Sequence, residues 1–224
     1  MIVSIVLVLV IGGVIAWFTI IEKITSPEES SLAVKSLIKT EQLAAITLPD
    51  RKNELLSALN ITKQNVSEGL THIYALTEGV DGQSVASADE VLVVLDWSMP
   101  GTLTRSITDL DFGARRGTQI TPYIILKTNN FESAFAGMVE WEVSISKDLT
   151  PFFGPVVDKS LKLETGDSKQ IVAAKFVDTH VNNRRIRILY DETGLERIVY
   201  GIHNQNTIII TTNQTDWIEL VNRL

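Results

Sequence analysis

The chain contains no cysteine, and only 3 of its 224 residues are histidine. Without thiols it can form no disulfide bond, cysteine nucleophile, CxxC zinc site or iron–sulfur centre. His72, His180 and His203 lie far apart in the sequence and lack the i, i+4 spacing of a helical metal site. We interpret each of them as a structural side chain and predict no metal or cofactor.

An excess of basic charge is also missing. The net charge is −7, and residues 24–100 hold 5 Lys and Arg against 11 Asp and Glu, which gives 5 − 11 = −6. Nucleic-acid binding needs a basic face, so no nucleic-acid partner is predicted. Hydrophobic residues make up 45% of the chain, which is enough for a packed core.

Catalytic signatures are lacking too, because no GxSxG, Walker or GxGxxG motif occurs. Asp111-Phe112-Gly113 matches the kinase DFG tripeptide, but no glycine-rich loop or catalytic loop accompanies it. SxxK occurs at 36–39 and 144–147 without the KTG strand of penicillin-binding enzymes. We assign no catalytic, cofactor-binding or metal-binding residue, and a protein that is not an enzyme is favoured.

One long hydrophobic run is present at the start of the chain. Ile2 to Ile21 carries no charge, and a helix of these 20 residues would span a bilayer's hydrocarbon core of about 30 Å. Trp17 lies near its end, where an indole ring favours the interface. The pattern predicts a transmembrane anchor at 1–23, with the lipid bilayer as the partner of Ile2 to Ile21. A cleaved secretory signal is the alternative, although no Lys or Arg precedes the run.

A tether and lead-in are expected at 24–42 and an α+β domain at 43–224. Strands are predicted at 44–48, 72–76, 123–127 and 207–211, each followed by a helix. The first helix follows Pro49-Asp50 and turns Leu55, Leu56 and Leu59 inward. Ser87 and Glu90 form a capping box before Val91 to Leu95, which is apolar enough to be deeply buried. A short helix follows Met99-Pro100-Gly101.

The later helices carry clearer patterns. Asn129 and Glu132 resemble a capping box, and one amphipathic helix is predicted through the inward-facing Phe131, Phe135, Met138, Trp141, Ile145 and Leu149. Asn213 to Asp216 opens the last helix, with Trp217, Ile218, Val221 and Leu224 inward. The similarity between 123–138 and 207–221 leaves an internal duplication, with a subdivision near 128–130, as an alternative to one undivided domain.

Antiparallel strands are predicted between these helices. Residues 156–163 and 170–177 flank a turn at 164–167, and 185–190 and 195–200 flank a turn at 191–194. A further reversal at 204–206 leads into the last strand. The fold class is therefore α+β, in which an N-terminal transmembrane helix precedes a mixed or antiparallel sheet domain with about four to five packed helices.

The C-terminal half resembles uncharacterised single-pass membrane proteins of candidate-phyla bacteria. The resemblance rests on 131–142 and 148–154, on 176–191 and on the closing 206–212, and it covers about the last hundred residues. It implies a cytoplasmic, often proline-rich tail before the span and a domain outside the membrane. It implies no activity and no site residue.

Orientation and function follow as expectations. Lys23, Lys35 and Lys39 follow the run, and the positive-inside rule alone would place the domain in the cytoplasm. The resemblance favours an extracytoplasmic, membrane-anchored binding or assembly module with a protein partner in the envelope. The alternative is an anchored envelope enzyme that uses loop carboxylates, for which Asp109, Asp111, Asp148 and Asp178 are the candidates. Arg184, Arg185 and Arg187 form the one basic cluster, which is either an anion or partner contact or a solvent-facing strand.

Overall fold

A computed structural model of the chain describes residues 34–79, 82–155, 161–162, 171–172, 175–191 and 193–224. The predicted anchor at 1–23 and the first part of the tether lie outside the described residues. In the described part of the chain, no helix is long and apolar enough to cross a membrane. The domain that the structure describes begins at Val34.

Strands and helices do not alternate regularly along the domain, which is typical of an α+β protein. The strands are β1 (Gln42–Thr47), β2 (Gly69–Gly79), β3 (Gly82–Val85), β4 (Ile107–Arg116), β5 (Ile120–Thr128), β6 (Leu161–Lys162), β7 (Ile171–Val172), β8 (Phe176–Val181), β9 (Arg184–Tyr190), β10 (Glu196–His203) and β11 (Thr207–Thr211). The helices are α2 (Lys52–Gln64), α3 (Ala88–Leu95), α4 (Gly101–Ser106), α5 (Phe131–Trp141), α6 (Ile145–Phe153) and α7 (Gln214–Val221).

Nine of these strands form one mixed sheet in the order β1-β2-β4-β5-β11-β10-β9-β8, with β3 paired to the far part of β2. β1 runs parallel to β2, as their connection through α2 allows, and the other pairs in this sheet are antiparallel. The predicted strands at 44–48, 72–76, 123–127, 185–190, 195–200 and 207–211 are confirmed, and so is the meander that α7 closes. The reversal at 204–206 uses Asn204 and Gln205 with φ of 47° and 62°, the left-handed geometry of a tight hairpin turn.

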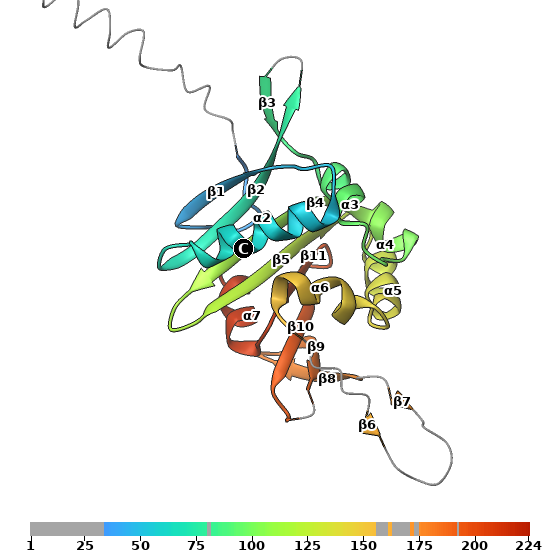
Figure 1. Cartoon of the computed structure of the whole chain (residues 1–224). Coiled ribbons are helices and arrows are strands. Elements are labelled where there is room, and N and C mark those ends of the chain that lie inside the picture. Colours follow the sequence, from blue (N-terminus) through green and yellow to red (C-terminus); the bar gives the residue numbers. More distant parts are fainter. Residues whose placement is uncertain (1–33, 80–81, 156–160, 163–170, 173–174, 192) are drawn as a thin grey trace, which may run out of the picture. The chain divides into compact units, whose positions relative to one another are not determined.

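The sheet is covered on both faces (Figure 1). On β5, Ile124 and Leu126 pack into the larger cluster with α2 to α6, while Tyr123 and Ile125 turn to the opposite face. That second face holds α7, through Trp217, and the lead-in residue Ile38, which is 4% exposed. Residues 34–41 therefore pack onto the domain ahead of β1.

Two predicted helix starts have the expected caps. Ser87 and Glu90 form the reciprocal capping box of α3. Asn213 is the N-cap of α7, and its side chain accepts a hydrogen bond from Asp216 N at 2.8 Å. The predicted start at Asn129 is wrong by one residue, since Asn130 is the cap of α5 and accepts from Ser133 N instead of forming a box with Glu132.

The single long helix predicted from 131 to 149 is wrong, and the described part of the domain therefore has six helices instead of the four to five expected. α5 ends at Trp141 and α6 begins at Ile145, and the Trp141 indole donates a hydrogen bond to the Asp148 carboxylate across the break. Phe131 and Phe135 are 43% and 40% exposed and do not face the core.

The core side of α5 is instead made of small residues. A Cβ on Gly137 would lie 2.5 Å from Leu103 Cβ, so α5 can approach α4 this closely only with glycine there. Close backbone packing through Ala134 and Gly137 thus rotates both phenylalanines outward. The periodicity of large residues therefore gave the wrong face for the first turns of this helix.

Three further expectations need correction. Val91, Leu92 and Leu95 are buried, but Val93 is 78% exposed, so α3 is covered on one side only. Leu224, predicted to face inward, is 45% exposed. Of the hairpin predicted at 156–177, only β6 and β7 pair within the described residues, and Phe176 and Val177 belong to the separate strand β8; the turn at 164–167 lies outside them.

Candidate functional site

The four candidate carboxylates do not form a site. Asp109 and Asp111 lie in β4, Asp148 in α6 and Asp178 in β8, so the prediction that they come from loops is wrong. Asp148 Oδ2 accepts hydrogen bonds of 2.8 Å from both Trp141 Nε1 and Ser98 N and holds α5, α6 and the chain after α3 together. The enzyme alternative gains no support from these positions.

Asp111 belongs to a buried polar cluster on the α7 side of the sheet. Its Oδ2 accepts from Ser36 Oγ at 3.0 Å and from Leu37 N at 2.6 Å, and its Oδ1 lies 3.4 Å from His72 Nε2. Burial raises the pKa of the Asp111 carboxyl and lowers the pKa of the His72 imidazole. Both residues are under 5% exposed, so this cluster attaches the lead-in to the sheet and is not accessible to a substrate.

The basic cluster is largely neutralised within the protein. Arg185 and Arg187 share one face of β9, as predicted, and Ile186 and Ile188 are buried on the other. Arg187 pairs with Glu142 through two hydrogen bonds and with Asp178 at 3.0 Å, and Arg185 Nε lies 3.2 Å from Asp178 Oδ1. Hydrogen bonding to Glu142 raises the pKa of Arg187, so this guanidinium stays charged and engaged.

An apolar groove adjoins this network, between α5 and the strands β9 and β10. It has a volume of about 340 Å³ and is lined by Phe131, Phe135, Arg185, Arg187, Tyr200, Gly201 and Ile202. The rings of Phe131 and Phe135 stack at 6.1 Å on its rim. Nothing in the described residues identifies a molecule that would cover it.

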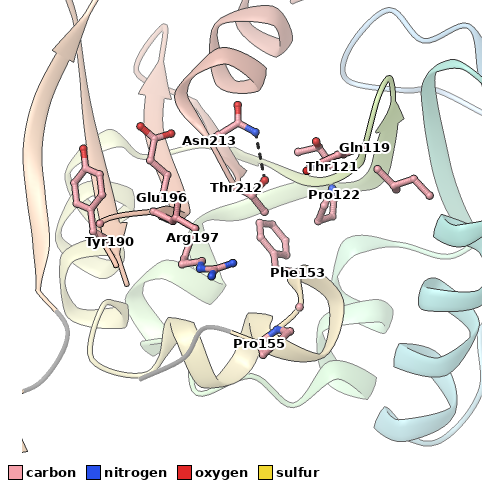
Figure 2. A pocket seen from close by; sticks show the side chains of 14 residues that line it. Gln119, Thr121, Pro122, Phe153, Pro155, Tyr190, Glu196, Arg197, Thr212 and Asn213 are labelled. Carbon is pink, nitrogen blue, oxygen red and sulfur yellow. Dashed lines mark hydrogen bonds between the residues drawn. The ribbon is translucent and has the colours of Figure 1, made fainter. Parts of the chain in front are cut away.

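The larger hollow lies at one end of the sheet and has a volume of about 630 Å³. We call it the sheet-end pocket. Its lining comes from the start of β5, the end of α6, the end of β9, the start of β10 and the link from β11 to α7 (Figure 2). The lining residues are Gln119, Ile120, Thr121, Pro122, Phe153, Gly154, Pro155, Tyr190, Gly194, Leu195, Glu196, Arg197, Thr212 and Asn213.

Arg197 is held in place by the turn that precedes β10. Asp191 Oδ2 accepts from Arg197 Nε at 2.7 Å, while its Oδ1 accepts from Thr193 N at 2.8 Å and from Leu195 N at 3.0 Å. The hydrogen bond from the Thr193 hydroxyl, with these amide and guanidinium donors, holds the pKa of Asp191 well below its usual range. The Arg197 side chain points toward Phe153 in Figure 2.

The opposite wall is fixed by the start of α7. Glu196 Oε2 accepts from Gln214 N at 2.7 Å, and the Gln214 amide binds the same carboxylate. Asn213 caps the helix through its oxygen, and its Nδ2 lies 3.5 Å from Thr212 Oγ1, the contact dashed in Figure 2. Three polar side chains of the pocket, Arg197, Glu196 and Asn213, are thus held in position by the protein itself.

Two aromatic side chains complete the lining. Phe153 ends α6 and is half-buried, and its ring meets that of Phe152 edge-on at a centroid distance of 5.9 Å. Tyr190 ends β9 and is also half-buried. The pocket therefore combines apolar ring surface with amide, hydroxyl and guanidinium groups.

No residue of this pocket was singled out from the sequence as a site residue. Its members span from Gln119 to Asn213 and come from five elements, and none lies in a recognised motif. Among the described residues, no group of three or more His, Asp or Glu side chains could hold a metal ion.

The domain is thus an α+β sheet with helices on both faces and a preformed polar–aromatic pocket at one end. No protein-family model, curated protein or solved structure matches the chain.

Proposed function

We propose that this protein is a membrane-anchored binding or assembly module and that the sheet-end pocket is its ligand site. The observation that carries the proposal is the fixed position of Arg197, Glu196 and Asn213, which Asp191, Gln214 and Asp216 respectively hold by hydrogen bonds. Small-molecule sites are typically concave, preformed and lined by apolar surface with a few placed polar groups. The sheet-end pocket is concave and has several polar side chains held in place, although its lining is more polar than apolar.

Binding explains the pocket better than catalysis does. A general acid or base needs an ionisable group that is free to exchange a proton with the substrate. Asp191 is occupied by Arg197 and by backbone amides, and Glu196 is occupied by the start of α7. These carboxylates position other groups of the pocket and are not free to act as a general acid or base. The function that we assign to the pocket is therefore ligand binding and not catalysis.

The anchor and its orientation are part of the same proposal. The uncharged run from Ile2 to Ile21 supports a single membrane span. The resemblance of the C-terminal half to single-pass membrane proteins supports a domain on the envelope side of the membrane. Alkaline carbonate extraction of membranes from expressing cells tests the span, and the full chain should stay in the pellet. Protease added to intact spheroplasts should then digest the domain, and protection of the domain until lysis would place it in the cytoplasm.

Photo-crosslinking in cells tests the pocket as the ligand site. A photoreactive amino acid is placed at Gln119, on the pocket's exposed rim, and in a control chain at Val93, which is 78% exposed on α3. We expect a defined adduct from position 119 and none from position 93, read by mass spectrometry of the purified full chain. Equal or absent adducts at the two positions would refute the assignment of the pocket.

A further inference from the structure

We propose that the sheet-end pocket binds a short, uncharged saccharide. This inference rests on the proposed function, in which the same pocket is the ligand site, and it adds the chemical class of the ligand. It follows from three properties of the lining: its charge balance, its mixture of rings with hydrogen-bonding groups, and the pairing of the strands around it.

The charge balance of the pocket favours a neutral ligand. Among the residues that the structure describes, Arg197 and Glu196 are the only charged members of its lining, one of each sign. Arg197 Nη2 lies 2.6 Å from Asp191 Oδ2, and Glu196 accepts from the Gln214 backbone at 2.7 Å. A charged ligand would have to compete with one of these pairs, whereas a hydroxyl can share their remaining hydrogen-bonding capacity.

The side chains around these two groups suit a ring with hydroxyls on its rim. Gln119 and Asn213 bring amides, and Thr121 and Thr212 bring hydroxyls, so both donors and acceptors are present. A sugar hydroxyl is also both a donor and an acceptor. The Phe153 and Tyr190 rings offer apolar surface on which the C–H face of a sugar can rest.

An extended peptide fits this position less well. Peptides that add to a sheet pair their backbone with an open strand edge. The strands that line the pocket are interior to the sheet, because β5 lies between β4 and β11, β10 between β11 and β9, and β9 between β10 and β8. A ligand must therefore be recognised here by side chains and not by strand pairing. Side-chain amides and aromatic rings can recognise a sugar in this way.

The size of the pocket is also suitable. Its volume of about 630 Å³ lies within the range of roughly 300–1,000 Å³ that is typical of small-molecule sites. It leaves room for more than one sugar ring, so a di- or trisaccharide unit of a longer glycan is the expected ligand. The pocket opens to solvent at the exposed residues Gln119, Gly194 and Leu195, which would let such a glycan continue outward.

Saturation-transfer NMR on the full chain tests the proposal. The protein is held in a detergent without a sugar headgroup, because alkyl glycosides would compete for the site. The probes are N,N′-diacetylchitobiose, cellobiose and maltose, compared with an acetylated, amidated tri-alanine and with inorganic phosphate. We expect transfer to at least one disaccharide and none to the peptide or to phosphate.

Paired variants locate the binding. Q119A should lower the affinity for the disaccharide at least fivefold. Q83A, which truncates an exposed glutamine on β3, should leave that affinity unchanged. F153A should abolish transfer, whereas F131A, which removes an exposed phenylalanine on α5, should not. Thermal unfolding of F153A separates loss of binding from loss of fold, and Q119A serves alone where F153A has unfolded.

The outcomes distinguish the two proposals. Binding of the peptide or of phosphate in place of all three disaccharides, or equal affinities for Q119A and Q83A, would overturn the saccharide assignment. Adducts from position 119 in cells would still support the pocket as the ligand site in that case. A failure of both the crosslinking and the disaccharide titration would remove the proposed function as well.

Discussion

Replacing Asp148 with alanine tests whether this carboxylate stabilises the fold. Asp148 is 4% exposed, and its Oδ2 satisfies two buried donors, Trp141 Nε1 and Ser98 N. A buried donor left without a partner costs about 1–3 kcal/mol. D148A should therefore lower the free energy of unfolding by about 2–6 kcal/mol. Such a loss is a large share of the ~5–15 kcal/mol that stabilises a typical domain.

The assay is urea unfolding of the full chain in detergent micelles, followed by circular dichroism. D148N keeps an acceptor oxygen in place and should cost less than D148A. D109A truncates an exposed carboxylate on β4 and should change the stability by no more than about 0.5 kcal/mol. These two variants show whether the loss depends on removing the acceptor from its buried position.

A double-mutant cycle with W141F isolates the indole–carboxylate contact. W141F removes one donor and keeps most of the ring, so the coupling energy between the two substitutions should be about 1–2 kcal/mol. The structural reasoning would be refuted if D148A were as stable as the parent chain, or if the two losses were simply additive.

Three further changes test other parts of the fold by the same assay. G113A should destabilise the chain by about 3 kcal/mol or more, because its Cβ would lie 2.0 Å from Tyr123 Cζ and 2.4 Å from Thr71 O; a loss under about 1 kcal/mol would contradict this packing. S87A should cost about 1 kcal/mol through the lost cap of α3, and S87T should restore most of it, since threonine also caps. Burial lowers the pKa of His72 in the folded chain below its unfolded value of about 6.5. As the pH falls below that value, the His72 imidazole is protonated in the unfolded chain before it is protonated in the folded chain. The free energy of unfolding should therefore fall until the pH has dropped through the pKa of His72 in the folded chain. H72Q should flatten that decline between about pH 7 and pH 5, and an unchanged profile would show that His72 does not cause it.

Local chemistry made much of the fold predictable. The capping box at Ser87 and Glu90 and the asparagine at 213 are satisfied by residues three positions away, so tertiary contacts hardly alter them. The meander from β9 to β11 follows from alternating Arg and Ile and from tight reversals. In these segments the sequence and the tertiary structure favour the same conformation.

β4 was missed although its apolar residues alternate, because aspartates at positions 109 and 111 are more typical of a loop than of a strand. Asp111 is polar but lies on a buried face, where it binds Ser36 and Leu37 from a segment more than 70 residues earlier. Leu110 and Phe112, two positions apart and both packed on the α2–α6 side, were the available signal. A polar residue with a distant buried partner makes a strand look like a loop.

The sheet-end pocket could not be predicted for a related reason. Gln119, Phe153, Tyr190, Arg197 and Asn213 each lie at an element boundary, where polar residues and turns are common in any domain. These residues lie close together only because β5 and β10 both pair with β11. No local sequence pattern predicts that pairing. Sites assembled from element ends are visible only once the strand order is known.

Helix α7 links the pocket to the segment that leads toward the predicted anchor. Its first residue, Gln214, binds Glu196 at the pocket wall, and just beyond its end the Arg223 carbonyl accepts a hydrogen bond from Lys39 N at 3.1 Å. Arg223 also pairs with Glu41, immediately before β1. Eight helical residues rise about 12 Å, so the two contacts lie roughly one short helix apart. A ligand that stabilises the start of α7 would therefore also stabilise the attachment of the lead-in, because both depend on the same helix remaining packed on the sheet through Trp217.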